Sequence, residues 1–258
     1  MRPYDTGVTL KAVFFDVGDT LVEGWIGREE TNAIVREVLR REFGERHWFE
    51  DFLKADFWPK PDVKAIADEE ASLRQETHRW YEQWFRNASI GIDDIDMDRL
   101  RIAATVPLDL VGKPVPGAFP AVRWCKEQGL KVALVTNTLS RGDEEVWEDW
   151  RRFGLADAID AVASSHSVGW QKPHRAIFER ALQLTGARPE DTVMIGDRTD
   201  ADILGAKRLG MRAVLRRTAN EEAMRDVGVS PDAAIDDLTT LPDVLSAWIR
   251  VPNAQRTS

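Results

Sequence analysis

The sequence predicts an α/β fold in which a Rossmann-like parallel-sheet core carries an inserted all-helical domain. From residue 108 onward, short apolar runs alternate with helical patterns, and this alternation is typical of right-handed βαβ crossovers in a parallel sheet. Residues 28–106 instead show helical periodicity with little sign of strands, although an apolar strand pattern precedes them. We therefore expect the core to comprise residues 1–22 and 108–258, interrupted by a helical insertion at 23–107.

The first strand and the turn after it are predicted within residues 11–21. Val13, Phe14 and Phe15 form an apolar run of the kind that suits a buried strand. Asp16 follows directly, at the carboxyl end of the strand, where open α/β sheets bind their ligands. A carboxylate in that place can serve as a nucleophile.

The insertion contains four helical patterns. Aspartates suited to cap helix N-termini precede the third and fourth patterns, and a glycine suited to end a helix follows the first. The patterns cover 34–43 with Gly44 as the stop, 48–53, 62–91 with Asp62 as the cap, and 96–104 with Asp96 as the cap.

The rest of the core alternates between apolar runs and helical patterns. One helix, at 173–185, is expected to carry Pro173 in its first turn, where the missing N–H costs nothing. Strands are predicted at 131–135, 158–163, 192–195, 213–215 and 233–235, and the other helices at 116–128, 201–209 and 241–249.

Composition excludes several classes of partner. The chain has 258 residues, a net charge of −9 and a pI of about 5.1, so a nucleic-acid partner is not expected. No run approaches the roughly 20 apolar residues that cross a bilayer, and the N-terminus lacks an apolar signal segment, so no membrane partner is expected. Cys125 is the single cysteine, which rules out an internal disulfide and fits a reducing compartment. We expect a cytoplasmic monomer or homodimer.

Ten tryptophans are unusual for this length. Burial in the core or at an interface explains most of them, because an indole ring removes a large area from water. Some are expected to line a substrate pocket or an oligomer surface. Half of them lie in or near the insertion: Trp25, Trp48, Trp58, Trp80 and Trp84.

Polar side chains gather where the predicted strands end. Asp16, Thr136-Asn137 and Gly196-Asp197 each follow an apolar run, and the carboxyl ends of parallel strands share one edge of a sheet. Two further groups are expected at this edge: Lys172, which precedes a helix, and Asp202, which follows Asp197 by five residues.

Crowded carboxylates repel one another unless a cation or a proton lies among them. A hard, oxygen-preferring ion such as Mg²⁺ suits such a cluster. Together with a lysine and backbone N–H groups, the ion would make a site for a phosphoryl group, which Asp16 could attack to form an aspartyl-phosphate.

With these residues in place, the chain resembles the haloacid dehalogenase superfamily of hydrolases over nearly its whole length. The resemblance is carried by four motifs in the order that the family uses. They are 16–21, 132–137, Lys172-Pro173, and Gly196-Asp197 followed by Asp202.

The resemblance implies a Mg²⁺-dependent phosphatase that acts on a small phosphate monoester. It also implies that the helical insertion is a cap domain that closes over the substrate and excludes water. By position, it makes Asp16, Thr136 and Lys172 the catalytic residues, with Asp16 the nucleophile; Thr136, Asn137 and Lys172 bind the substrate; and Asp16, Gly18 (through its backbone carbonyl), Asp197 and Asp202 serve the metal.

The first motif departs from the family pattern. Phosphatases of the family usually read Asp-x-Asp-Gly-Thr, and the second aspartate serves as general acid and base. Here the order is Asp16-Val17-Gly18-Asp19-Thr20, so the aspartate stands one position late. Loss of general acid–base help typically costs about 10²–10⁴ in rate. Asp19 is more simply interpreted as a residue that caps the turn.

Three interpretations therefore remain open at the level of sequence. In the first, the protein is a phosphatase that is either slow or helped by Asp19, water or the substrate itself. In the second, it cleaves carbon–halogen or carbon–phosphorus bonds, as members without that aspartate do. In the third, it is a weakly active or inactive binding module. The Gly196-Asp197 pair argues against the halogen case, since dehalogenases usually replace it. Carbon–phosphorus cleavage needs a cap lysine, for which Lys54, Lys60 and Lys64 are available.

Overall fold

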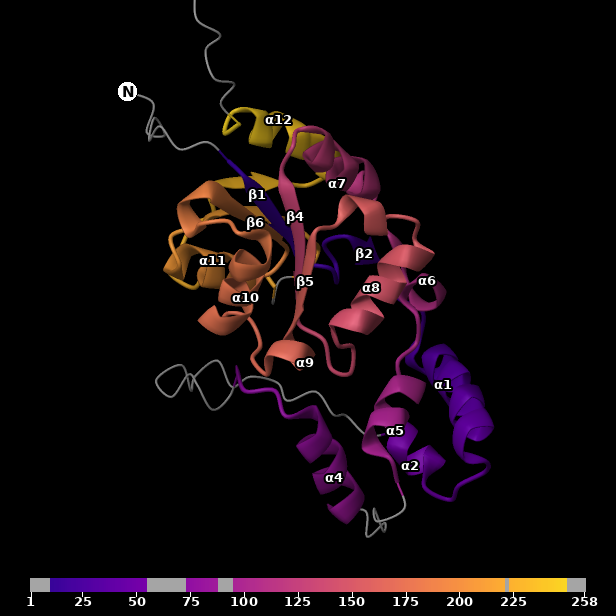
Figure 1. Cartoon of the computed structure of the whole chain (residues 1–258). Helices are drawn as coiled ribbons and strands as arrows, with labels where there is room; N and C mark the ends of the chain where they lie inside the picture. Colours follow the sequence, from indigo (N-terminus) through magenta and orange to yellow (C-terminus); the bar gives the residue numbers. More distant parts are fainter. Residues whose placement is uncertain (1–9, 55–72, 88–94, 221–222, 250–258) are drawn as a thin grey trace, which may run out of the picture.

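The computed structural model describes residues 10–54, 73–87, 95–220 and 223–249 (Figure 1). Its centre is a six-stranded sheet in the order β5-β4-β1-β6-β7-β8, and every neighbouring pair is parallel. The parallel-sheet core predicted from the sequence is confirmed. The strands are β1 (Ala12–Phe15), β4 (Lys131–Thr136), β5 (Ala161–Ser164), β6 (Thr192–Gly196), β7 (Arg212–Arg216) and β8 (Ala233–Ile235).

β1 lies in the interior of the sheet because it is apolar on both faces. It pairs with β4 on one side and β6 on the other, and all four of its side chains are fully buried. Val13 and Phe15 enter one hydrophobic core, while Ala12 and Phe14 enter a second core on the opposite face. This alternation follows from the two-residue period of a strand.

Helices cover both faces of the sheet (Figure 1). One core is closed by α7, α8 and α12, and the other by α10 and α11. The fold is thus a doubly covered parallel sheet of the Rossmann-like kind. The helices are α7 (Ala118–Glu127), α8 (Asp143–Arg152), α10 (Arg175–Thr185), α11 (Leu204–Arg208) and α12 (Leu241–Ser246), with the short α9 (Ser165–Val168) after β5.

The helices of the insertion gather beyond the carboxyl ends of the strands (Figure 1). Aromatic packing around Trp48 joins them: its ring centroid lies 4.8 Å from that of Phe49 and 5.3 Å from that of Phe85. The described helices of this part are α1 (Arg28–Phe43), α2 (Phe49–Lys54), α4 (Thr77–Asn87) and α5 (Met97–Ala103), followed by α6 (Leu108–Val111). Gly44 and Asp96 end and begin their helices as predicted.

The two chain crossings between core and insertion are tied together by a small ribbon. β2 (Val22–Glu23) pairs antiparallel with β3 (Lys113–Pro114). Glu23 therefore belongs to a strand, although the insertion was predicted to be all helical. Two-residue strands leave too short a pattern to be detected in a sequence.

The long helix predicted at 62–91 is wrong around Arg74. Arg74 instead pairs with Trp170 in an antiparallel bridge, and α4 (Thr77–Asn87) begins only after it. Backbone bonding to a distant core loop has replaced helical bonding there, which local periodicity cannot reveal. The predicted ends of that helix, at 62–72 and beyond Asn87, lie outside the described residues.

Several core elements also differ from prediction. Pro173 lies outside α10, because His174 caps that helix by accepting a hydrogen bond from Ala176 N at 3.2 Å. The helix predicted at 201–209 begins instead with a π turn over Thr199–Ile203. α8 was not predicted. In the described parts of the chain, no helix combines the length and apolar character that a membrane span requires.

Candidate active site

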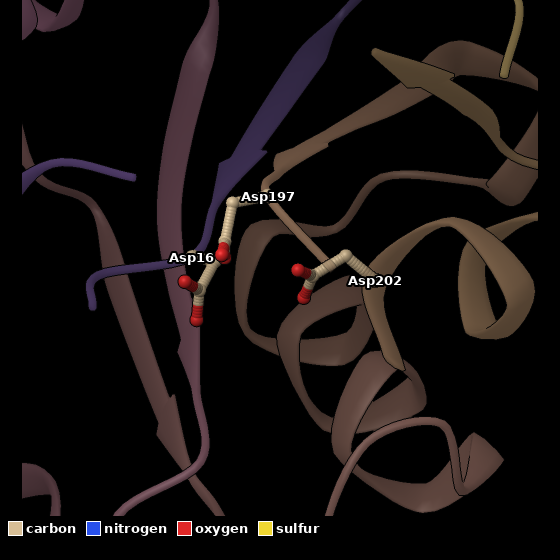
Figure 2. Close-up of side chains that lie close together, drawn as sticks. All are labelled: Asp16, Asp197 and Asp202. Atoms are coloured by element: carbon tan, nitrogen blue, oxygen red, sulfur yellow. The ribbon is translucent and has the colours of Figure 1, made fainter. Parts of the chain in front are cut away.

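Asp16 lies one residue beyond the carboxyl end of β1 (Figure 2), and the insertion helices lie on this side of the sheet (Figure 1). Its backbone N donates to Ile195 O at 2.9 Å, so the parallel pairing with β6 continues through this residue. Only 7% of the residue is exposed. The carboxylate is thereby held at a fixed point between β4 and β6.

Lys172 is the cationic partner of Asp16. Its Nζ lies 2.5 Å from Asp16 Oδ1 and 2.7 Å from Asp202 Oδ1, and it donates to Val135 O at 2.8 Å. Burial opposes the charge on this ammonium, but Asp16 and Asp202 outweigh burial and raise the pKa of Lys172 above its usual value. The ammonium therefore stays charged where it can balance an anion.

Asn137 holds the backbone of Lys172 in place. Its Oδ1 accepts from Lys172 N at 2.8 Å, and its Nδ2 donates to Lys172 O at 3.3 Å. The structure thus connects the end of β4 to the loop that carries the lysine. Thr136, the last residue of β4, is buried, and both it and Asn137 line the cavity described below.

Three carboxylates converge in Figure 2: Asp16, Asp197 and Asp202 each offer one oxygen, and these oxygens lie within 4.8 Å of one another. Asp202 fits because Gly196 has no side chain, since a Cβ there would lie 2.3 Å from Asp202 Cγ. Burial, together with the charges of Asp16 and Asp202, raises the pKa of Asp197 to about 8. Burial likewise raises the pKa of Asp202 to about 6.

The cluster fits a hard metal ion. Its donors are all oxygens, and a divalent cation would offset both the burial and the mutual repulsion that raise these pKa values. Thr20, to which the sequence analysis gave no role, joins two of the carboxylates: its Oγ1 lies 3.1 Å from Asp16 Oδ2 and 3.4 Å from Asp197 Oδ1. The place of Thr20 within the first motif is the one sequence signal that could have pointed to this role.

Asp19 is engaged in the turn after Asp16. It adopts a left-handed backbone conformation (φ 52°), which aspartate tolerates better than most residues. Its Oδ1 accepts from the Trp25 indole at 2.8 Å, and its backbone carbonyl accepts from the Arg216 guanidinium. These contacts agree with the interpretation of Asp19 as a turn residue.

A cavity of about 410 Å³ opens beside the strand ends. Gly18, Thr136 and Asn137 line its core side, while Trp25 and Val106 belong to the wall formed by the insertion. Apolar side chains make up much of the lining. The cavity has room for a small organic group next to Val17 and Gly18, which follow Asp16, and next to Thr136 at the end of β4.

A family model of haloacid dehalogenase-like hydrolases matches residues 10–210. The chain belongs to this family. The expectation drawn from the four motifs is thus confirmed at the level of the family, and the hydrolase fold agrees with the sheet order and the convergent carboxylates described above.

Curated relatives carry phosphatase names. Glyceraldehyde 3-phosphate phosphatase of Methanopyrus kandleri is 30% identical over 242 residues, which cover 92% of this chain and 97% of that protein. The protein of the same name from Methanothermobacter thermautotrophicus is 34% identical over 137 residues, 52% of this chain and 59% of that protein. The second alignment therefore spans little more than half of either protein.

Solved structures show the same fold. The 2-haloacid dehalogenase from Pseudomonas syringae pv. Tomato DC3000 matches with a TM-score of 0.59 and 23% identity, over 93% of this chain and 100% of that one. At this identity the likeness concerns the fold alone and carries no preference between dehalogenase and phosphatase chemistry.

Asp197→Asn is expected to raise the melting temperature of the metal-free protein at pH 7.5. The folded-state pKa of Asp197 is about 8, and an unfolded chain gives about 3.9. At a pH between these two pKa values, the folded state retains a proton that the unfolded state has lost. The free energy of unfolding therefore falls as the pH rises through this range. Asparagine removes that loss. Calorimetry in the presence of a chelator should show a smaller rise in the melting temperature of Asp197→Asn at pH 5 than at pH 7.5.

The matched control is Asp157→Asn, because the Asp157 side chain is 74% exposed and its ion pair with Arg123 lies on the surface. It should leave the melting temperature nearly unchanged. Added Mg²⁺ should stabilise the parent protein and this control but not Asp197→Asn. A lower metal-free melting temperature for Asp197→Asn than for the parent protein would show that the Asp197 carboxylate does not destabilise the folded state.

Proposed function

We propose that the protein is a Mg²⁺-dependent phosphatase that hydrolyses a small phosphate monoester through an aspartyl-phosphate on Asp16. The observation that carries the proposal is the contact of Lys172 with both Asp16 and Asp202, within a cluster of three buried carboxylates. Such a cluster fits a metal ion beside a nucleophile and a fixed cation. The phosphatase names of the relatives support the same reaction class.

The chemistry proceeds in two displacements. An Asp16 oxygen bonds to phosphorus as the bond from phosphorus to the leaving oxygen breaks, and water then releases phosphate from the carboxylate. Lys172 and the Thr136 hydroxyl hold phosphoryl oxygens, and Asn137 keeps Lys172 in position for this task. When bound, Mg²⁺ supplies positive charge that balances the phosphoryl oxygens and the carboxylates.

The metal would be held by Asp16, Asp197 and Asp202, and by the backbone carbonyl of Gly18. The hydrogen bonds of the turn run from Asp19 N to Val22 O (2.7 Å) and from Val22 N to Val17 O (3.0 Å), so neither of them occupies that carbonyl. We also propose that residues 23–107 act as the cap and that 1–22 and 108–258 form the catalytic core. A cytoplasmic location and a monomeric or homodimeric state remain predictions from sequence.

Carbon–phosphorus and carbon–halogen cleavage are less well supported. Lys54 is exposed at the end of α2 and does not line the 410 Å³ cavity, while Lys60 and Lys64 lie outside the described residues. Two acidic residues beside Lys172 suit a metal-assisted reaction better than a metal-free displacement of halide. Phosphoryl transfer is therefore the function that the geometry supports best.

The purified protein is expected to hydrolyse 4-nitrophenyl phosphate in the presence of Mg²⁺. Chelation with EDTA should remove activity, and added Mg²⁺ should restore it, because the carboxylates need the cation to accept an anionic substrate. Absorbance of the released nitrophenol measures the rate. Halide release from 2-haloacids in EDTA would overturn the proposal in favour of a dehalogenase. Absence of turnover across a broad phosphate panel would favour a binding module.

A further inference from the structure

The cavity beside Asp16 lacks an evident proton donor. Its described lining has no aspartate, glutamate, histidine or lysine; the polar lining consists of hydroxyls, the Asn137 amide and Arg141. Arg141 is tied to Asp149 (3.0 Å) and to the backbone of Val106, and a guanidinium does not give up its proton. A leaving oxygen in this cavity therefore has to depart without help from these side chains.

Trp25 forms the wall of the cavity next to Gly18. A Cβ on Gly18 would lie 3.8 Å from Trp25 Cζ2, an ordinary van der Waals contact, so the ring flanks the position from which a side chain at residue 18 would reach the substrate. The ring also packs on Gly112, where a Cβ would come within 2.9 Å of it. The indole thus lies beside the place that an acidic side chain at residue 18 would occupy.

The indole is fixed but remains accessible. Its Nε1 donates to Asp19 Oδ1 at 2.8 Å, which sets the orientation of the ring. Nevertheless 43% of the residue is exposed, an unusual exposure for so large an apolar side chain in a cavity wall. An oriented and accessible aromatic face is suited to stack on a flat apolar group.

We propose that Trp25 is a specificity-determining residue that selects aryl phosphates, that is, phosphate esters of aromatic hydroxyls. This inference rests on the phosphatase activity proposed above. In the first displacement the P–O bond to the aryl oxygen breaks, and the electron pair leaves on that oxygen as a phenolate, which takes a proton from solvent later. Phenolic hydroxyls have a pKa of about 10, whereas water, and alkyl alcohols with it, lies near 15.7. Only the phenolate leaves readily without a proton.

The first test compares leaving groups on the intact wild-type protein with Mg²⁺. Substrates are phenyl phosphates whose phenols span several pKa units, together with glyceraldehyde 3-phosphate and glycerol phosphate as alkyl esters. We expect kcat/KM to fall as the pKa of the phenol rises. For the alkyl esters it should be at least about 100-fold lower, because about 10² is the lower end of the rate contribution of a general acid. Alkyl esters turned over within about threefold of phenyl phosphate would overturn the inference. If the protein is not a phosphatase, none of these esters is turned over, and this result differs from a loss of preference between aryl and alkyl esters.

The second test asks whether Trp25 recognises the aryl group. Trp25→Leu should lower kcat/KM for phenyl phosphate by about 2- to 10-fold, because it removes the aromatic ring that stacks on the phenyl group. Trp25→Phe keeps an aromatic ring and should retain most of the wild-type kcat/KM. Inhibition by inorganic phosphate, which has no aryl group, should not change in either. Leu184→Ala, at a similarly exposed apolar residue on α10 (42%), is the control and should match wild type. Equal losses for aryl and alkyl esters, or for phosphate inhibition, would overturn the assignment.

Discussion

Asp16→Asn is expected to abolish phosphatase turnover, with a loss of about 10⁴-fold or more. An amide has no anionic oxygen with which to attack phosphorus, and loss of a nucleophile removes the covalent route as a whole. The fold should survive, because Lys172 keeps its contacts with Asp202 (2.7 Å) and Val135 O (2.8 Å). Steady-state hydrolysis of 4-nitrophenyl phosphate measures the loss, and circular dichroism verifies the fold.

Rapid acid quenching adds a direct view of the intermediate. Wild-type protein mixed with substrate should gain the mass of one phosphoryl group on the peptide that contains Asp16, and Asp16→Asn should not. The matched control is Asp191→Asn, which also removes a buried, ion-paired carboxylate, but next to β6 at the opposite edge of the sheet. It should lower stability and leave kcat nearly intact. Turnover by Asp16→Asn within tenfold of wild type would rule out the nucleophile assignment.

The sequence predicted those features that depend on local pattern. The apolar runs before Asp16 and before Asp197 were correctly predicted as strands, because a buried parallel strand needs apolar residues on both faces. That these two strands pair with each other is known only from the structure. The rule that parallel strands end at one edge predicted that Asp16 and Asp197 lie together, and the short separation from Asp197 added Asp202. The structure brings the three together. The chemical roles of these residues remain proposals.

Contacts between segments far apart in the sequence could not be predicted. Gln75 donates from the insertion to Thr138 O at 2.5 Å, and Thr77 lies 3.0 Å from His166 Nδ1. Arg101 on α5 likewise reaches Ser140 O at 2.6 Å. Each contact joins the insertion to a loop after β4 or to α9, and hydrophobic periodicity contains no information on such pairings. The same limit hid the break at Arg74 in the predicted helix.

The position of Trp25 shows a further limit of local reasoning. The surplus of tryptophans suggested burial in the core or at an interface, or a place in a substrate pocket or an oligomer surface. The structure places Trp25 in the lining of the 410 Å³ cavity, bonded to Asp19 and close to Gly112. Gly112 matters here for the space that it leaves to the ring. A glycine kept for packing against a distant side chain cannot be told from a turn glycine in a single sequence.

Gly18→Asp is expected to raise kcat/KM for alkyl phosphates by about 10² or more, while aryl phosphates gain little. The new carboxyl group would supply the missing general acid, which typically contributes about 10²–10⁴. The site tolerates the change: the backbone of Gly18 is not in the left-handed region, and a Cβ would make an ordinary 3.8 Å contact with Trp25. The nearby carboxylates would also raise the pKa of the added group, which favours the protonated form that a general acid needs.

Gly18→Asn is the decisive control, because it has nearly the same size and hydrogen-bonding reach but cannot protonate a leaving oxygen. Equal gains for the two variants would show that the effect comes from packing against Trp25 and not from proton transfer. No gain in Gly18→Asp, with an intact fold and undiminished turnover of aryl phosphates, would mean that another group already protonates alkyl leaving oxygens. A rise in kcat/KM for alkyl phosphates in Gly18→Asp but not in Gly18→Asn would show that the lack of a proton donor at residue 18 is why this protein prefers aryl to alkyl phosphates.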